Sequence, residues 1–156
     1  MAGNDPSLVE SNQKAIKTAA ALAAATEAKS ASARYFIQPA SGLNWGILHD
    51  HNAVDIANSC GTPVKAAASG LVINDPDLGP GTAGWNGGYG DFVLIQHLNG
   101  TKTRYAHLSK IEVAVGTHVS QGDEIGLIGN TGHVQGETGC HLHFEVIGAP
   151  NPFAKS

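Results

Sequence analysis

Two histidines separated by one leucine lie near the end of the chain, in the stretch GCHLHFEV. The stretch has the composition of a strand, in which side chains alternate between two faces. His141 and His143 therefore share one face, with Cα atoms about 6.6 Å apart along an ideal strand. The alternating apolar residues face the other way and are expected in a core; they are Leu142, Phe144 and Val146. The two imidazoles are either ordinary surface side chains or part of a site.

A second group of possible ligands lies much earlier, in LHDHNAVDIA. His51 precedes Asp55 by four residues and His49 precedes His51 by two, so in one continuous strand all three would share a face. Zinc binds imidazole nitrogen and carboxylate oxygen, and a catalytic zinc takes three protein ligands plus water. One histidine and Asp55 from this group, with one histidine of the later pair, would supply such a set. Because a His-x-x-x-Asp pair is common by chance, the evidence for zinc is the coincidence of the two groups.

The composition is that of a globular chain, with 42% hydrophobic residues, 14% charged residues and a net charge of −4. All eight histidines lie between His49 and His143, which favours a site over random surface use. The negative charge argues against a nucleic-acid partner. No apolar run approaches the ~20 residues of a membrane span. The start of the chain, MAGNDPSLVE, has no basic segment, so a secretion signal would have to lie outside this sequence.

The amino-acid composition changes near residue 35, and we divide the chain into residues 1–34 and 35–156. Residues 7–34 are rich in Ala and contain neither Gly nor Pro, which predicts a helix from about Ser7 to Ala31. This helix is either the end of a longer coiled coil or a linker without a function of its own. From Tyr35 onward, short β-like runs are broken by Gly, Pro, Asn and Asp.

The second segment is predicted to be an antiparallel all-β domain, a sandwich or partly open barrel. The Asn99-Gly100 dipeptide lies between two alternating runs and predicts a hairpin with a two-residue type I′ turn. That turn would pair Leu98 with Thr101 and place Leu94 opposite Tyr105. The expected strands are 35–38, 53–57, 64–67, 70–74, 92–96, 103–107, 124–128 and 141–147.

Five stretches carry a family resemblance: HNAVDIA, GTPVKAAASGLV, YAHL, VGTHVSQGDEIGLIGNTG and HLHFEV. In this order they resemble the lysostaphin-like zinc endopeptidases of bacterial cell-wall metabolism, over residues 42–146. The resemblance implies that family's fold, a zinc metallopeptidase domain at residues 35–156, and one zinc ion per chain. By the family pattern the metal ligands would be His51, Asp55 and His143, and the catalytic histidines His107 and His141. His49 is the alternative first ligand, because it lies only two residues before His51.

Other residues have two interpretations each. Trp85 and Tyr89, in the Gly-rich loop 75–90, and His133 are candidates for substrate contact, with ordinary packing as the alternative. Glu145 shares the face of His143 and would either orient that ligand or face solvent. His97 and His118 are expected to have structural or solvated roles.

Cys60 and Cys140 are the two cysteines of the chain. Each lies a few residues from a proposed ligand, so if Asp55 and His143 bind one ion the two thiols are brought together. We therefore predict a disulfide between them, as expected for an exported protein. Free thiols and thiolate ligation of the metal are the alternatives.

The resemblance implies hydrolysis of peptide bonds in the cross-links or stem peptides of peptidoglycan, outside the cytoplasm. Peptidoglycan is thus the expected partner, whereas the oligomeric state is not indicated. Either catalytic histidine can act as the base, and several cross-link bonds fit the same zinc chemistry. The rival interpretation is a non-enzymatic activator of cell-wall amidases with the same fold, which would be expected to lack part of the ligand set.

Overall fold

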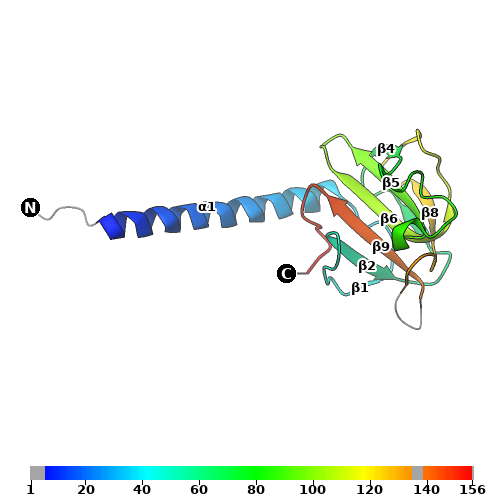
Figure 1. Cartoon of the computed structure of the whole chain (residues 1–156), viewed down its shortest axis with the longest axis horizontal. Helices are drawn as coiled ribbons and strands as arrows, with labels where there is room; N and C mark the ends of the chain where they lie inside the picture. The colour runs from blue at the N-terminus through cyan, green and yellow to red at the C-terminus, as the bar shows by residue number, and fades with distance from the viewer. Residues whose placement is uncertain (1–5, 135–138, 156) are drawn as a thin grey trace, which may run out of the picture.

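A computed structural model describes residues 6–134 and 139–155 of the chain. It consists of one long helix followed by a β domain (Figure 1). Helix α1 spans Pro6–Tyr35 and projects away from the β domain, so most of its side chains are exposed. Its last turn is anchored, because Ser32 is buried and Tyr35 packs against the core. The helix expected from the Ala-rich composition is confirmed and continues four residues beyond Ala31.

The β domain is one nine-stranded antiparallel sheet, in agreement with the all-β expectation. Its main path runs β1-β2-β9-β6-β5-β4-β7, and β8 pairs with both β6 and β3. The strands are β1 Leu43–Asn44, β2 Ala53–Ala57, β3 Pro63–Lys65, β4 Gly70–Ile73, β5 Asp91–His97, β6 Lys102–Ile111, β7 His118–Val119, β8 Glu124–Ile128 and β9 His141–Ile147. A short 3-10 turn, η1, covers Asn86–Gly88. The strand expected at residues 35–38 is absent, since α1 and its exit occupy that segment.

Alternation along β9 divides its residues between a core and a polar face. Leu142, Phe144 and Val146 are at most 1% exposed and belong to the main hydrophobic cluster, as their spacing predicted. Across the sheet, the Tyr105 hydroxyl accepts a hydrogen bond from the backbone N–H of Ala67 at 2.8 Å, which satisfies a polar atom inside this core. The opposite face of β9 is thereby left to His141 and His143.

The hairpin between β5 and β6 differs from the prediction by one residue. Leu94 pairs with Arg104 rather than Tyr105, because the hairpin closes at His97 and Thr101. Three residues therefore form the loop instead of two, and Gly100 takes a φ of 87° within it. The one-residue shift exchanges the two faces of the strand, since side chains alternate with period two. Tyr105 consequently faces the main core and Arg104 faces the other side.

Cys60 and Cys140 are joined as a disulfide, with Cα atoms 5.3 Å apart. Cys60 follows β2 and Cys140 directly precedes β9, so the bridge ties together the ends of two paired strands. It closes a loop with a sequence separation of 80 residues. A cross-link over so long a loop stabilises the fold mainly by restricting the unfolded chain.

We predict that replacing Cys140 by Ser lowers the free energy of unfolding. The chain-entropy model gives about 4.5 kcal/mol for a loop of this size, with about 2 kcal/mol as the lower end of typical values. Denaturant titration of the two forms measures the difference. Thiol titration of the denatured, unreduced protein should find no free thiol, and two free thiols per chain would contradict the bridge.

Candidate active site

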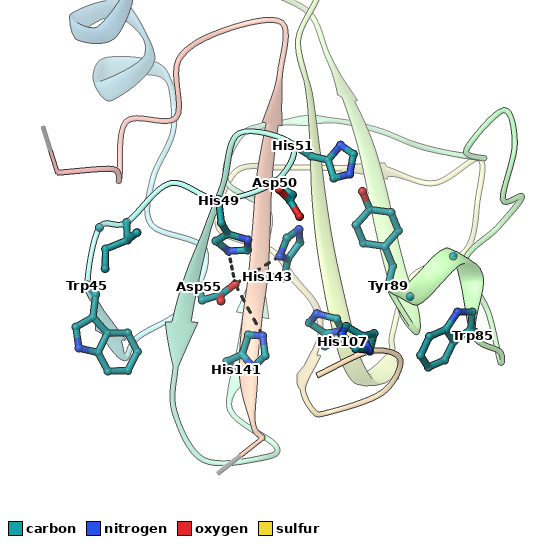
Figure 2. Close-up of a pocket in the computed structure, with 15 residues that line it drawn as sticks. Trp45, His49, Asp50, His51, Asp55, Trp85, Tyr89, His107, His141 and His143 are labelled. Carbon is teal, nitrogen blue, oxygen red and sulfur yellow. Dashed lines mark hydrogen bonds and ion pairs between the residues drawn. The ribbon is translucent and has the colours of Figure 1, made fainter. Parts of the chain in front are cut away.

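The sheet register sets the position of the first two candidate ligands. Asp55 on β2 lies directly opposite His143 on β9, and Ala57 lies opposite His141. On the other side of β9, Ala106 of β6 is opposite His143, so His107 of β6 lies next to this row. Directly opposed residues in an antiparallel pair point to the same face. Alternation alone would turn His107 to the opposite face, but its left-handed φ of 61° interrupts the alternation, and its ring centroid lies 5.6 Å from that of His143. Three neighbouring strands thus bring a carboxylate and three imidazoles together (Figure 2).

A tight turn before β2 determines which earlier histidine joins them. His49 and Ala53 form an antiparallel bridge, so residues 50–52 make the turn between them. His51 and Asn52 have φ values of 68° and 57°, a left-handed conformation that ends any continuous strand. Asn52 is held there by its side-chain amide, which donates to two carbonyls, of Val146 and Ala149, at 2.9 Å each. Because His49 is opposite Ala53, it shares a face with Ala53 and Asp55.

The structure therefore places His49, and not the expected His51, beside Asp55. His49 Nε2 lies 2.9 Å from Asp55 Oδ1. His51, at the tip of the turn, points toward Tyr89, with ring centroids 6.2 Å apart (Figure 2). The expectation of His51 came from the His-x-x-x-Asp spacing of the family pattern. In the structure the left-handed turn takes His51 away from Asp55 and places His49 against it.

His49, Asp55 and His143 form a compact group of possible ligands, with donor atoms all within 4.8 Å of one another. His143 Nδ1 is 3.4 Å from Asp55 Oδ1. Ligands about 2.1 Å from a tetrahedral zinc lie about 3.4 Å apart, so these spacings suit a single ion. Two imidazoles and one carboxylate are also a donor set that zinc accepts, and the group opens to a pocket where water can complete the coordination.

Hydrogen bonds orient the ligand groups. His143 Nε2 lies 2.9 Å from Glu145 Oε1 and donates to it when Nδ1 faces Asp55. Burial alone would lower the pKa of His143, but its bonds to Asp55 and Glu145 raise it above the ordinary value. Burial alone would raise the pKa of Asp55, whereas the hydrogen bond from His143 and the surrounding histidines lower it. The Asp55 carboxylate is thus kept ionised, as a metal ligand must be.

His107 and His141 lie beside the ligand group, with ring centroids 5.0 Å apart. His107 Nδ1 is 2.7 Å from the carbonyl oxygen of Thr131, and His141 Nδ1 is 3.1 Å from that of Gly139. Each ring thus donates from Nδ1 and leaves Nε2 as the acceptor in its neutral form. Burial lowers the pKa of His107 to about 4, so this ring is neutral near pH 7. His107 also has a φ of 61°, a costly backbone conformation of a kind that clusters at active sites.

An open pocket of about 740 Å³ surrounds these groups. Trp85, Tyr89 and His133, which the sequence suggested as substrate contacts, all line it. Trp45 and Ile47 line it as well and are exposed; they were missed because the segment before β2 shows no regular pattern. Trp45 and Trp85 lie on opposite sides of the histidines in Figure 2, so the pocket has an indole at each end.

The remaining histidines lie outside this group. His97 is buried, and its Nε2 lies 2.8 Å from the hydroxyl of Thr103, which fits the expected structural role. His118 is exposed on β7, at the far end of the sheet. Glu145 is 1% exposed, so the interpretation that it faces solvent is wrong. Arg104, which binds Glu145 from β6, was not singled out from the sequence, because an arginine in an alternating run resembles an exposed strand residue.

Comparisons with known proteins agree with this fold and pocket. The family model described as Peptidase family M23 matches residues 49–154. A peptidoglycan DD-endopeptidase, ShyA of Vibrio cholerae, is 46% identical over 100 residues, which are 62% of this chain but 20% of ShyA. This chain thus spans about a fifth of that relative.

Solved structures extend the likeness to the fold. A zinc containing peptidase from Vibrio cholerae is 33% identical, with a TM-score of 0.53, and the match covers 78% of this chain and 37% of that one. Lysostaphin from Staphylococcus simulans is 35% identical, with a TM-score of 0.55, over 71% of this chain and 46% of its own. The resemblance noted from the five sequence stretches is thereby confirmed.

We predict that His49→Ala weakens zinc binding far more than His51→Ala. Loss of a residue that only hydrogen-bonds a metal ligand already costs about 10- to 100-fold in affinity, so loss of a direct ligand should exceed this. Zinc affinity is measured by competition with a chromophoric chelator. His51 is a matched control, because it is the same residue type on the same turn and lines the same pocket. Tight binding by His49→Ala together with loss in His51→Ala would contradict the ligand set.

Proposed function

Since the chain belongs to peptidase family M23, we propose that it is a zinc endopeptidase that cleaves peptide bonds in peptidoglycan cross-links or stem peptides. The observation that carries this proposal is the convergence of His49, Asp55 and His143 at the floor of one pocket, beside two further histidines. The relative ShyA is named for an activity on the same polymer. The match covers only a fifth of ShyA, so the activity of this protein as a whole is proposed here and is not carried over from ShyA.

The proposed ligands are His49 Nε2, Asp55 Oδ1 and His143 Nδ1. A zinc ion held there would lower the pKa of a bound water toward about 7 and polarise the scissile carbonyl. The single carboxylate leaves the bound cation with net positive charge, which suits activation of water. Asp55 is 37% exposed at its side chain, so its carboxylate lies at the boundary between the sheet and the open pocket.

His107 and His141 are the proposed catalytic histidines. Both rings have Nδ1 committed to a backbone carbonyl, so Nε2 is the atom available to the reaction. A neutral ring accepts the proton of the attacking water at Nε2. The other ring, carrying a proton on Nε2 as well as on Nδ1, donates to the oxygen that becomes negative as the carbonyl is attacked. Return of the accepted proton to the leaving amine completes the hydrolysis. The fixed Nδ1 bonds keep both rings oriented without further ordering during the reaction.

The pocket walls are suited to an extended peptide substrate. Trp45, Trp85 and Tyr89 offer apolar surface at the edges of the pocket, and Ile47 adds to it. A peptide strand could lie along these side chains with its carbonyl above the histidines. We propose Trp85, Tyr89 and His133 as substrate contacts, as the sequence suggested, and add Trp45.

An extracytoplasmic location is proposed because peptidoglycan lies outside the cytoplasm and disulfides persist in oxidising compartments. The Cys60–Cys140 bridge agrees with this. Among the described residues, no helix has the length and apolar character needed to cross a bilayer. The rival role, a non-enzymatic activator of amidases, is disfavoured because a complete donor set and both catalytic histidines converge in one pocket.

We predict that some of the histidines are needed to bind zinc and others only for turnover. His107→Ala and His141→Ala should retain zinc and lose turnover by about 10²- to 10⁴-fold, the usual contribution of a general acid or base. His143→Ala should lose both zinc and turnover. Release of soluble fragments from purified peptidoglycan measures turnover, and elemental analysis measures zinc.

The control is His118→Ala, which removes an exposed imidazole on β7 and should leave both measurements unchanged. Chelation should abolish activity of the unmodified protein, and added zinc should restore it. Loss of zinc from His141→Ala would contradict the assigned roles. A protein that binds zinc yet releases no peptidoglycan fragments would favour the non-enzymatic role.

A further inference from the structure

A buried charged cluster lies behind the proposed metal ligand His143. Arg104 on β6 is bound by two carboxylates: its Nη2 lies 2.8 Å from Asp75 Oδ2, and its Nε lies 3.0 Å from Glu145 Oε2. The three side chains are at most 10% exposed. Arg104 and Glu145 are directly opposed on the paired strands β6 and β9, so the sheet register fixes their contact. The cluster is part of the scaffold and not a chance surface ion pair.

Glu145 connects this cluster to the proposed metal site. One carboxylate oxygen, Oε2, accepts from Arg104, and the other, Oε1, lies 2.9 Å from His143 Nε2. His143 and Glu145 are two residues apart on β9 and therefore share a face. Tyr89, which lines the pocket, also hydrogen-bonds Glu145, and the Arg104 guanidinium stacks 4.4 Å from its ring centroid. Glu145 is thus held on several sides while it contacts the ligand.

We propose that Glu145, fixed by Arg104, is a positioning residue for the metal ligand His143. This inference rests on the proposed function. A carboxylate at Nε2 keeps the proton on that nitrogen and leaves the Nδ1 lone pair free for the ion. The same carboxylate also prevents rotation of the ring and makes the Nδ1 lone pair a stronger electron donor to the metal ion. His143 therefore presents the correct nitrogen before the metal arrives.

The charges of the buried cluster support this role. Two carboxylates share a single arginine, so one negative charge has no cationic partner within the cluster, and buried charge is costly unless it is balanced. Asp55 adds a further carboxylate on the other side of His143. A divalent cation held by His49, Asp55 and His143 would cancel the negative charge of the whole group. If the cluster only stabilised the fold, one of the two acidic residues, Asp75 or Glu145, would be enough to pair with Arg104.

The test compares Glu145→Gln with Asp75→Asn. Each replaces one of the two carboxylates of Arg104 by its nearly isosteric amide, but only Glu145 contacts His143. Zinc affinity is measured by chelator competition on protein that retains the circular dichroism of the parent. Glu145→Gln should weaken zinc binding about 10- to 100-fold, while Asp75→Asn should stay close to the unsubstituted protein. Equal zinc affinity in Glu145→Gln and the parent, or an equal loss in both variants, would overturn the proposal.

A second measurement needs no variant. In zinc-loaded protein labelled with ¹⁵N, the ring signals of His143 should show the metal on Nδ1 and a slowly exchanging proton on Nε2. Metal on Nε2 would overturn the proposal even if Glu145→Gln failed to fold. If the unsubstituted protein binds no zinc, or binds it and releases no peptidoglycan fragments, the proposed function fails instead. The two failures are therefore distinguishable.

Discussion

The antiparallel pairing of β2 with β9 is the constraint on which the rest of the site depends. It places Asp55 directly opposite His143, and the pairing of β9 with β6 places Ala106 on the other side of His143. A slip of one residue would turn His143 toward the core and bring Leu142 to the pocket. The alternating apolar side chains of β9 resist such a slip, because they fill the main hydrophobic cluster. The core and the site are therefore specified by the same register.

A turn, a disulfide and an ion pair hold the paired strands β2 and β9 in place around the ligand group. Before β2, the anchored turn at Asn52 directs His49 toward Asp55. Between the ends of β2 and β9, the Cys60–Cys140 bridge joins the two strands. Next to His143, Glu145 of β9 and Arg104 of β6 form a buried ion pair across the two neighbouring strands. The turn, the disulfide and the ion pair each hold a different part of the ligand group in place. Little reorganisation of the described scaffold is therefore needed to bind an ion.

The sequence predicted those features that follow from alternation and composition. The all-β class, the Ala-rich helix and the two faces of β9 all followed from short-range patterns. Parity along a strand could not separate His49 from His51, because both would share the face of Asp55; the left-handed turn that separates them in the structure has no local sequence signal. The hairpin register failed for a related reason: the closing pair His97–Thr101 leaves three loop residues where an Asn-Gly turn suggested two. The role of Arg104 depends on partners far apart in sequence, which no local pattern reveals.

The central claim is that one zinc ion is bound by His49 Nε2, Asp55 and His143 Nδ1. Anomalous diffraction at the zinc edge, from crystals of the zinc-loaded protein, tests it most directly. The account predicts a single strong peak within bonding distance, about 2.0–2.2 Å, of these three groups. A peak bonded to His51 in place of His49, or to His143 through Nε2, would contradict it.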